Sequence, residues 1–164
     1  MSAWIGATEL SITWVETSDY WKWNYLHDAG VEVAELLNVC WLDISGKIDA
    51  KRLTRKTSFA AYLVFKLIDD HNNLERAIAS VRFAKEKIEG TGKEGYTVFI
   101  SKTKEEGENG RFPHLRSDGW MEIKLGEFFN DLGEDGEVEM RLMGIDGLEW
   151  KSGLIVKGID IRPN

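Results

Sequence analysis

Apolar and polar residues alternate with a period of two in several short stretches of the sequence, and this alternation restricts the possible folds more than any other feature. The stretch 121–125 reads MEIKL, and the stretches 10–14, 138–143 and 159–161 repeat its pattern. Such alternation is typical of a β-strand with one buried and one solvated face. The stretch 60–68 is apolar at nearly every position, as expected of a central strand covered on both faces.

These stretches predict an all-β fold, an antiparallel β-sandwich with at most one or two short helical turns. A helical turn is expected within residues 31–39, where an apolar spacing of i, i+3 and i+4 begins at Val33. The 16 glycines, against 2 prolines, indicate glycine turns between the strands, and the polar residues 101–110 are expected to form a mobile loop. With 164 residues and no visible boundary, the chain is expected to be a single domain, 1–164.

The net charge and the single cysteine limit the partners and the compartment. A net charge of −7 and a pI near 5.1 disfavour duplex nucleic acid and anionic membranes, which need a concentrated basic face. No stretch is long and apolar enough to span a membrane, and the N-terminus lacks the pattern of a secretory signal. Cys40 alternates with Leu42 and Ile44 and is therefore expected to be a buried thiol, although an intermolecular disulfide stays open. These features predict cytoplasmic synthesis, no intrachain disulfide and a neutral partner.

Patterns typical of enzymes and metal sites are scarce in the sequence. His27, His71 and His114 are scattered without the spacing of a metal site, and no phosphate-binding loop or nucleophile elbow occurs. We therefore expect no catalysis, no metal and no cofactor. One alternative is a glycoside hydrolase, for which Glu137 and Glu139 are the candidate carboxylates. Another alternative is a structural filament or a protein-interaction module.

Aromatic residues give the strongest indication of function. The sequence holds 7 tryptophans, and residues 19–28 read DYWKWNYLHD, with polar residues between the rings. Trp21 and Trp23 share one face of any extended segment, and we expect this face to be exposed. Trp120 shares its parity with polar residues of the following strand and is expected to join the polar face. Three further tryptophans are expected to fill the ends of the core, with their N–H groups on carbonyls: Trp4, Trp41 and Trp150.

Exposed indoles beside hydrogen-bonding side chains suit a pyranose ring, which has an apolar C–H face and outward hydroxyl groups. Covering about 80 Å² of apolar surface contributes about 2 kcal/mol, so a single sugar is expected to bind weakly. Several such subsites would bring an oligosaccharide to micromolar affinity, which requires about 8 kcal/mol. An acetamido group would add an amide that pairs with backbone or carboxylate groups and discriminates among sugars.

Segments along nearly the whole chain together resemble a known family. In order they are LSITW, YWKW, VAELLNVCWLDISGKI, TSFAAYLVFKL, RFPHLRSDGWMEIKLGEFFN, GEDGEVEMRLM and WKSGLIVKGIDIRPN. They resemble the Nictaba-related lectins of plants, also called the phloem protein 2 group, and look closest to the short phloem lectins without an F-box. The resemblance implies a jelly-roll β-sandwich related to carbohydrate-binding modules, without catalysis. It also implies binding of N-acetylglucosamine oligomers (chito-oligosaccharides) and N-glycan cores, a homodimer, and a cytoplasmic location with presence in phloem sap.

The resemblance also implies which residues bind sugar. In the family, the tryptophan that closes LSITW and the first tryptophan of YWxW are associated with sugar binding, and here these are Trp14 and Trp21. By alternation alone, Trp14 would lie in the core beside Ile12. An acidic contact discussed for the segment GEDGEVEM corresponds to Glu137, whereas a further acid present in some relatives is replaced here by Gly144.

The candidate carbohydrate site combines aromatic and polar residues. It consists of four platform aromatics, one acid and three residues of the loop RFPHLRSDG: Trp14, Tyr20, Trp21, Trp23, Glu137, His114, Arg116 and Asp118. Location is a separate question, because some relatives carry an uninterrupted lysine run as a nuclear address. Here only Lys102 and Lys104 stand in that place, which gives weak support for nuclear import.

Overall fold

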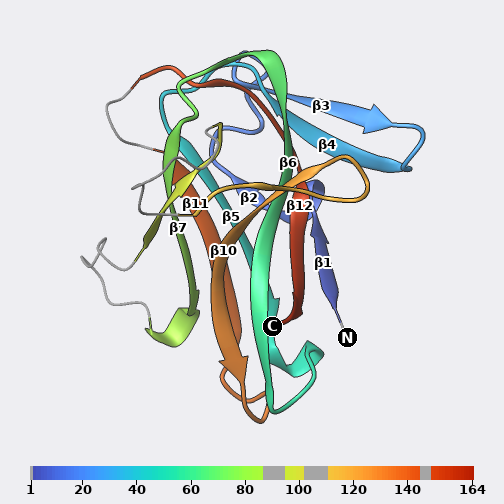
Figure 1. Cartoon of the computed structure of the whole chain (residues 1–164), viewed down its shortest axis with the longest axis vertical. Coiled ribbons are helices and arrows are strands. Elements are labelled where there is room, and N and C mark those ends of the chain that lie inside the picture. The colour runs from blue at the N-terminus through green and yellow to red at the C-terminus, as the bar shows by residue number, and fades with distance from the viewer. Residues whose placement is uncertain (1, 87–94, 102–110, 145–148) are drawn as a thin grey trace.

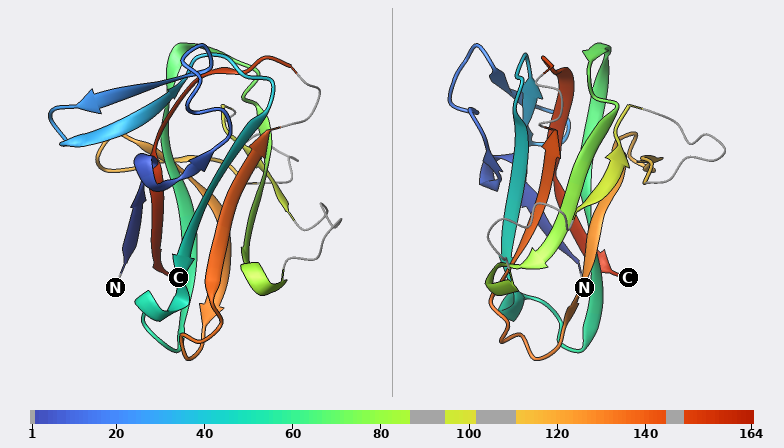
Figure 2. Two further views of the ribbon diagram at one scale, coloured as in Figure 1. Left: turned by 180° about the vertical axis from the view of Figure 1, so that it is seen from behind. Right: turned by 90° about the vertical axis from the view of Figure 1, so that its left-hand side faces the viewer.

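The computed structural model describes residues 2–86, 95–101, 111–144 and 149–164, and nearly all regular structure in them is β-strand (Figure 1). The named strands form two antiparallel sheets that lie face to face, as the side view shows (Figure 2). This architecture confirms the predicted antiparallel β-sandwich. Within these ranges, no helix is long and apolar enough to cross a membrane.

The first sheet has seven strands among the described residues, and its centre is a pair of long strands, β6 (Thr57–Asn72) and β12 (Ser152–Pro163). Beside β6 lie β10 (Met121–Asn130) and then β9 (His114–Leu115). Beside β12 lie β4 (Val31–Leu36) and then β3 (Trp21–Leu26), and β1 (Ala3–Gly6) also pairs with β12. The hairpin of β3 and β4 projects beyond the sandwich at the upper right of Figure 1.

The second sheet has five strands in the described ranges, in the order β2 (Ser11–Ile12), β5 (Leu42–Asp49), β11 (Glu137–Gly144), β7 (Arg76–Phe83) and β8 (Tyr96–Phe99). Strands β5 and β11 pair residue by residue along their whole length. The three helical turns in the described chain are single turns of 3-10 helix, η1 (Ala7–Glu9), η2 (Ala50–Arg52) and η3 (Ala84–Glu86).

The main core is the apolar layer between the two sheets. Phe59 and Phe65 enter it from β6, and Met140 enters it from β11; all three side chains are fully buried. Full burial of a side chain of this kind contributes about 1.5–3 kcal/mol relative to exposure. A smaller outer cluster, made of Val33, Val64 and Trp120, lies on the opposite face of the seven-stranded sheet. The predicted central strand 60–68 is therefore covered on both faces where Val64 lies.

A β-bulge in β12 changes which residues of that strand face the core. The pairing with β6 shifts between Val156 and Gly158. Val156 faces the core before the shift and Ile159 faces it after the shift, whereas Lys157 lies at the bulge. Strand β10 has a similar shift after Lys124.

Residues 31–39 begin with a strand and not with the predicted helical turn. Strand β4 lies between β3 and β12. Ala34 and Leu36 face the main core, whereas Val33 belongs to the outer cluster. Because both faces of the strand are buried, apolar residues occur at a spacing that also fits one side of a helix. The helical prediction is wrong for this reason.

Some smaller expectations also need correction or stay untested. The alternating stretch 10–14 forms only the two residues of β2, because the chain then enters a turn. Cys40 is a free thiol that is half-buried rather than buried. Of the loop 101–110 that was expected to be mobile, residues 102–110 lie outside the described residues, as do Lys102 and Lys104. The single-domain assignment stays a prediction.

We expect glycine to be required at position 158, where β1 pairs with β12. A Cβ atom at Gly158 would overlap the carbonyl oxygen of Ile5, which belongs to the paired backbone and cannot move aside. Gly158→Ala should therefore lower the free energy of unfolding in urea by about 1–3 kcal/mol, the usual effect of overpacking. Gly6→Ala is the control, because Gly6 pairs with Gly158 and its nearest obstacle is 3.7 Å away. Equal stability of the two variants would contradict this prediction.

Candidate functional site

An exposed group of aromatic residues lies at the base of the β3–β4 hairpin. Trp14 and Tyr20 come from the segment between β2 and β3, and Trp150 comes from the segment before β12. The ring centroids of Trp14 and Tyr20 are 5.4 Å apart with 37° between the planes. Those of Tyr20 and Trp150 are 6.4 Å apart with 34° between the planes. We call these three residues the aromatic cluster.

Trp14 points outward because of its backbone conformation. Its φ angle is 65°, in the left-handed region that bulky residues rarely occupy. The turn is fixed on both sides: the Thr13 N–H donates to the carbonyl of Asp43 at 3.0 Å, and the Thr17 N–H donates to the carbonyl of Trp14 at 3.0 Å. The Trp14 side chain is 45% exposed, so the expectation from alternation that it lies in the core is wrong. Strain of this kind costs about 1–3 kcal/mol and is often found at functional sites.

Backbone hydrogen bonds hold the other two members of the aromatic cluster. The carbonyl of Tyr20 accepts the N–H groups of Leu37 and Asn38, at 2.9 and 3.2 Å. The carbonyl of Trp150 accepts the side-chain amide of Asn73 at 2.7 Å. The half-buried Tyr20 packs against the main core, and Trp150 is 50% exposed. The cluster is therefore held in place from beneath and open from above.

Lys151, next to Trp150, ties this segment to the sandwich. The Lys151 side chain is only 3% exposed. Its ammonium group donates to the carbonyl of Cys40 at 3.2 Å and to the carbonyl of Glu149 at 2.9 Å. Its backbone also exchanges hydrogen bonds with Val39, at 2.6 and 2.9 Å. These contacts fix the direction in which the chain enters β12.

The predicted exposure of Trp21 is wrong, because only 2% of this residue is exposed. Trp21 and Trp23 share one face of β3, as the alternation predicts, but this face packs against the main core. Trp23 is half-buried against that core. The indole Nε1 of Trp21 is buried without a hydrogen-bond partner among the described residues. A sugar platform that includes the Trp21 face itself is therefore not present at the surface.

The burial of the other tryptophans also differs from several of the predictions. Trp4, Trp41 and Trp150 were expected to fill the core ends, but all three are exposed. Trp120 lies on the outer face of its sheet, as its parity predicts, yet it is only 6% exposed because the outer cluster covers it. Alternation thus predicts the face of a strand correctly, but not whether another element covers that face.

Glu137 lies away from the aromatic cluster. It is exposed at the start of β11, opposite Asp49, whereas Ile12 of β2 pairs with Ile44. The 5-residue interval between Asp49 and Ile44 along β5 corresponds to about 17 Å. Glu137 and Glu139 share the outer face of the five-stranded sheet. Within the described part of the chain, no group of three or more His, Cys, Asp or Glu side chains could hold a metal ion.

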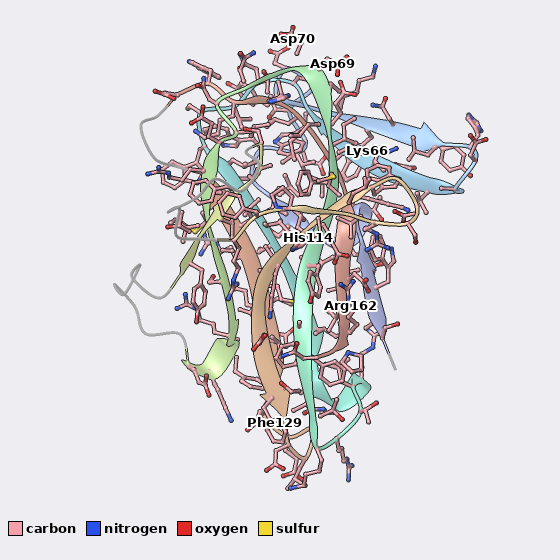
Figure 3. All side chains as sticks on the ribbon, viewed as in Figure 1. Lys66, Asp69, Asp70, His114, Phe129 and Arg162 are labelled. Atoms are coloured by element: carbon pink, nitrogen blue, oxygen red, sulfur yellow. The ribbon has the colours of Figure 1, made fainter. Side chains whose placement is uncertain are left out.

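The predicted polar residues of the loop RFPHLRSDG lie on the outer face of the seven-stranded sheet. The guanidinium of Arg116 donates to Asp118 at 3.3 Å and to Asp160 at 3.4 Å. Asp118 in turn accepts the backbone N–H of Trp120 at 3.0 Å. His114 is exposed on β9 and lies between Lys66 and Arg162 in Figure 3. The structure thus places these residues on the sheet face and not in the aromatic cluster.

The pKa of Asp118 lies below its ordinary value of 3.8. Slight burial acts to raise this pKa, but the hydrogen bonds from the Trp120 N–H and the Arg116 guanidinium outweigh it. The positive charges of Arg116 and Lys157 lower it further. The Asp118 carboxylate is therefore held in its charged form beside the loop.

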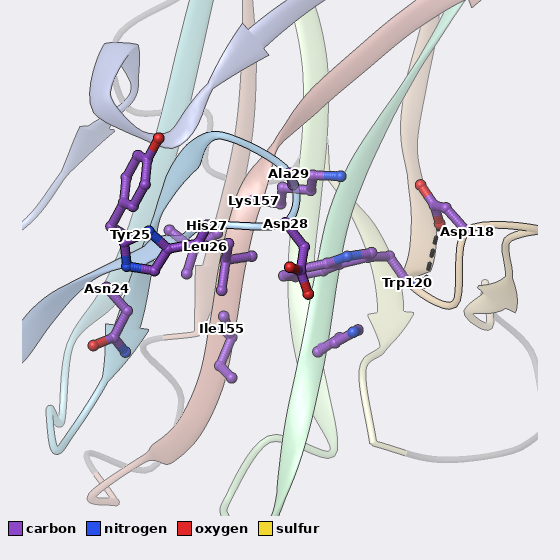
Figure 4. A pocket seen from close by; sticks show the side chains of 12 residues that line it. Asn24, Tyr25, Leu26, His27, Asp28, Ala29, Asp118, Trp120, Ile155 and Lys157 are labelled. Carbon is purple, nitrogen blue, oxygen red and sulfur yellow. Dashed lines mark hydrogen bonds between the residues drawn. The ribbon is translucent and has the colours of Figure 1, made fainter.

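A cavity of about 750 Å³ lies beside this loop and was not foreseen from the sequence. Figure 4 shows Tyr25 and His27 on the hairpin side and Asp118 and Trp120 on the loop side. Lys157 also lines it. The one sequence signal that could have indicated the cavity is Lys157, which breaks the alternation of β12. One polar residue at an apolar position is not enough to recognise a bulge in a sequence.

The chain matches a described protein family over almost its whole length. The family model for phloem protein 2 matches residues 1–163. Among curated proteins of Arabidopsis thaliana, the putative F-box protein PP2-B2 is 38% identical over 155 residues, covering 93% of this chain and 50% of that protein. The F-box protein PP2-B10 is 36% identical over 163 residues, covering 97% of this chain and 59% of that protein. The chain thus spans about half the length of the curated relatives it matches.

Similar solved structures include two carbohydrate-binding modules. The CBM22-1 xylan-binding domain of Paenibacillus barcinonensis Xyn10C aligns with a TM-score of 0.45 and 10% identity, covering 99% of this chain and 92% of that domain. The mannan-recognising module TmCBM27 aligns with a TM-score of 0.41 and 10% identity, covering 99% and 88%. Scores of this size carry no functional conclusion.

Trp21 and Trp14 are expected to differ sharply in their effect on stability. Trp21→Ala removes a buried indole and should lower the free energy of unfolding by about 3–5 kcal/mol. Trp14→Asn removes a half-exposed indole and places a residue that tolerates a left-handed φ, so its stability should equal or exceed that of the wild type. Urea unfolding followed by circular dichroism measures both. A stable Trp21→Ala protein would refute the burial of Trp21.

The lowered pKa of Asp118 predicts a pH-dependent stability. Because the folded pKa is below the ordinary value of 3.8, the carboxylate stabilises the fold above that pH, and this contribution is lost as the pH falls through the folded pKa. Asp118→Asn should lower the melting temperature at neutral pH, and the deficit should shrink as the pH falls below 3.8. Ser117→Ala, at the exposed neighbouring position, should show no such dependence. A deficit of Asp118→Asn that is constant with pH would rule out its ionic origin.

Proposed function

The chain belongs to the phloem protein 2 family, and on this premise we propose that it is a lectin that binds N-acetylglucosamine oligomers and N-glycan cores. Membership of the family supports a carbohydrate-binding role in general. The narrower preference for N-acetylglucosamine is supported by the resemblance of its motifs to the Nictaba-related lectins. The observation that carries the proposal is the outward position of Trp14, held there at an energetic cost.

In this proposal the aromatic cluster is the stacking surface. Trp14, Tyr20 and Trp150 form a row of rings in which each plane is tilted from the next. Each ring that covers about 80 Å² of apolar sugar surface contributes about 2 kcal/mol. A trisaccharide that contacts three rings would gain about 6 kcal/mol in this way, and a few polar contacts would bring it to micromolar affinity, about 8 kcal/mol.

Trp21 and Trp23 have a supporting role in this proposal. Both pack on the main core beneath the hairpin base, where Tyr20 also packs. Trp21 therefore acts on sugar binding through the position of its neighbour Tyr20 and not by contact with the ligand. This arrangement accounts for a sugar-binding role of both motif tryptophans, although only Trp14 is exposed.

Polar contacts to the sugar would come from the segment that joins the two aromatic positions. Its side chains are all exposed: Glu16, Thr17, Ser18 and Asp19. They offer hydroxyl and carboxylate groups to sugar hydroxyls and to the N–H of an acetamido group. Glu137 belongs to a different part of the surface, so we assign it no contact with the ligand in the aromatic cluster.

The wider properties of the protein follow the family as proposals. We propose that the chain has no catalytic activity, forms a homodimer, and acts in the cytoplasm and in phloem sap. The curated relatives are named as F-box proteins.

Calorimetric titration with chitotriose tests the stacking surface. Trp14→Ala and Trp150→Ala should each weaken binding by about tenfold or more, because each removes about 2 kcal/mol of stacking. Trp4→Ala is the matched control, because Trp4 is an exposed tryptophan on β1, outside the aromatic cluster. Intrinsic tryptophan fluorescence should shift on ligand addition in the wild type and in the control.

Three results would decide against the proposal. Undiminished affinity in Trp14→Ala and Trp150→Ala would reject the aromatic cluster as the sugar site. Release of reducing ends from chitin fragments, abolished by Glu137→Gln, would instead establish a glycoside hydrolase. Equal affinity for mannose or galactose oligomers would refute recognition of the acetamido group.

A further inference from the structure

A small cavity in the outer face of the five-stranded sheet borders the segment that carries Trp14. Its volume is about 220 Å³, and it lies where β2 pairs with β5 and β5 pairs with β11. Every described residue that lines it is polar or charged, and three of them carry hydroxyl groups, namely Ser11, Thr13 and Ser45. We call it the polar cavity. Because no apolar side chain lines it, a ligand in this cavity must bind through hydrogen bonds.

The charges that line the polar cavity balance one another. Asp43 and Glu139 supply two carboxylates. Lys47 and Arg141 supply two cations. A ligand with a net charge would be attracted by one of these pairs and repelled by the other, so the lining favours an uncharged ligand.

An ion pair between two strands holds the centre of the polar cavity in place. Arg141 donates from Nε and Nη2 to the two carboxylate oxygens of Asp43, at 2.9 and 2.6 Å. The two side chains are 28% and 14% exposed, so water screens this pair only partly. The carboxylate keeps further lone pairs, and Asp43 takes up only two of the three guanidinium nitrogens. Both groups can therefore also bind a ligand without losing each other.

Strand pairing brings hydroxyl groups beside this ion pair. Ser45 lies opposite Arg141 on one side and opposite Ser11 on the other, so these three side chains share one face of the sheet. The N–H of Thr13 donates to the carbonyl of Asp43 at 3.0 Å, which continues the contact of β2 with β5. Groups that are fixed before a ligand arrives bind it with a smaller loss of entropy.

The polar cavity begins where the row of aromatic rings ends. Trp14 stands at one end of this row, since its ring meets Tyr20, whose ring in turn meets Trp150. Thr13, the residue before Trp14, lines the polar cavity, and consecutive Cα atoms are about 3.8 Å apart. An oligosaccharide that extends past Trp14 on this side would place its next sugar at the polar cavity.

We infer that the polar cavity is a further subsite for the oligosaccharide that stacks on the aromatic cluster. This inference rests on the proposed function and adds to it a sugar that is held by hydrogen bonds and not by stacking. The sugar donates hydroxyl hydrogens to Asp43 and accepts hydrogen bonds from Arg141 and Ser45 at its hydroxyl oxygens. A neutral ligand rich in hydroxyl groups matches the lining, whereas an apolar ligand would leave the polar groups without partners.

Calorimetric titration with chitotriose and with chitopentaose tests this inference. Chitotriose can occupy the three rings of the aromatic cluster, whereas chitopentaose has further sugars that can enter the polar cavity. Wild-type protein should bind chitopentaose about tenfold more tightly than chitotriose, or better, because additional hydrogen bonds form. Ser45→Leu fills the cavity and should reduce the ratio of the two affinities about tenfold, while the affinity for chitotriose stays unchanged.

Ser80→Leu is the matched control for the cavity variant. Ser80 of β7 lies opposite Arg141 from the other side and shares its face of the sheet, but it does not line the polar cavity. This variant should keep the wild-type ratio of affinities. A second test is Arg141→Met, which keeps the apolar stem, removes the guanidinium group and should also reduce the ratio. Thermal unfolding followed by circular dichroism establishes that each variant is folded.

The inference fails in three cases. Equal affinity of the wild type for chitotriose and chitopentaose would mean that no sugar is bound beyond the aromatic cluster. A wild-type ratio in both Ser45→Leu and Arg141→Met would place the additional contacts elsewhere. An equal reduction in Ser45→Leu and Ser80→Leu would indicate an effect on the sheet and not on the cavity. All three outcomes leave the proposed function intact, because that function is overturned only through chitotriose, by unchanged affinity in Trp14→Ala or by a wild type that does not bind it.

Discussion

Burial of Trp21 in the apolar layer between the sheets is the interaction on which the surface chemistry depends. This indole fixes the base of the β3–β4 hairpin against the sandwich. Tyr20, which precedes it, is thereby held at the rim of the core, where it meets the exposed ring of Trp14. An aromatic residue inside the protein thus determines the position of those outside. The same anchoring leaves the hairpin tip free to project over the neighbouring sheet face.

Period-two alternation allowed the fold to be predicted from the sequence, and its breaks mark where prediction failed. The stretches 121–125, 138–143 and 159–161 are strands as expected, because each has one face on the core. Residues 31–39 were misjudged because a strand covered on two sides has no period-two signal. Alternation placed Trp14 in the core because the sequence gives no sign that a tryptophan adopts a left-handed backbone conformation. Trp21 was misplaced because both faces of an extended segment look alike until another element covers one of them.

The hairpin carries two chemically different surfaces at its two ends. Its base, beside Tyr20, carries contacts between uncharged aromatic rings. Its tip borders a cavity in which the ammonium groups of Lys66 and Lys157 each lie near the Trp120 ring. Stacking on bare rings depends little on salt, whereas contacts of charged groups are sensitive to ionic strength. One hairpin thus borders both surfaces.

The bulge in β12 changes the phase of the alternation between buried and exposed residues along the strand. Upstream of it the residues of one parity face the core, and downstream the other parity does, so that Val156 and Ile159 are both buried. Regular pairing of every residue there, without the bulge, would turn Ile159 and Ile161 towards water and send Asp160 inward. The bulge therefore keeps Val156 and Ile159 on the same face of the sheet, although three positions separate them. The residue at position 157 lies at the bulge and lines the cavity, so a substitution there would change the charge of the cavity without altering the core face of the strand.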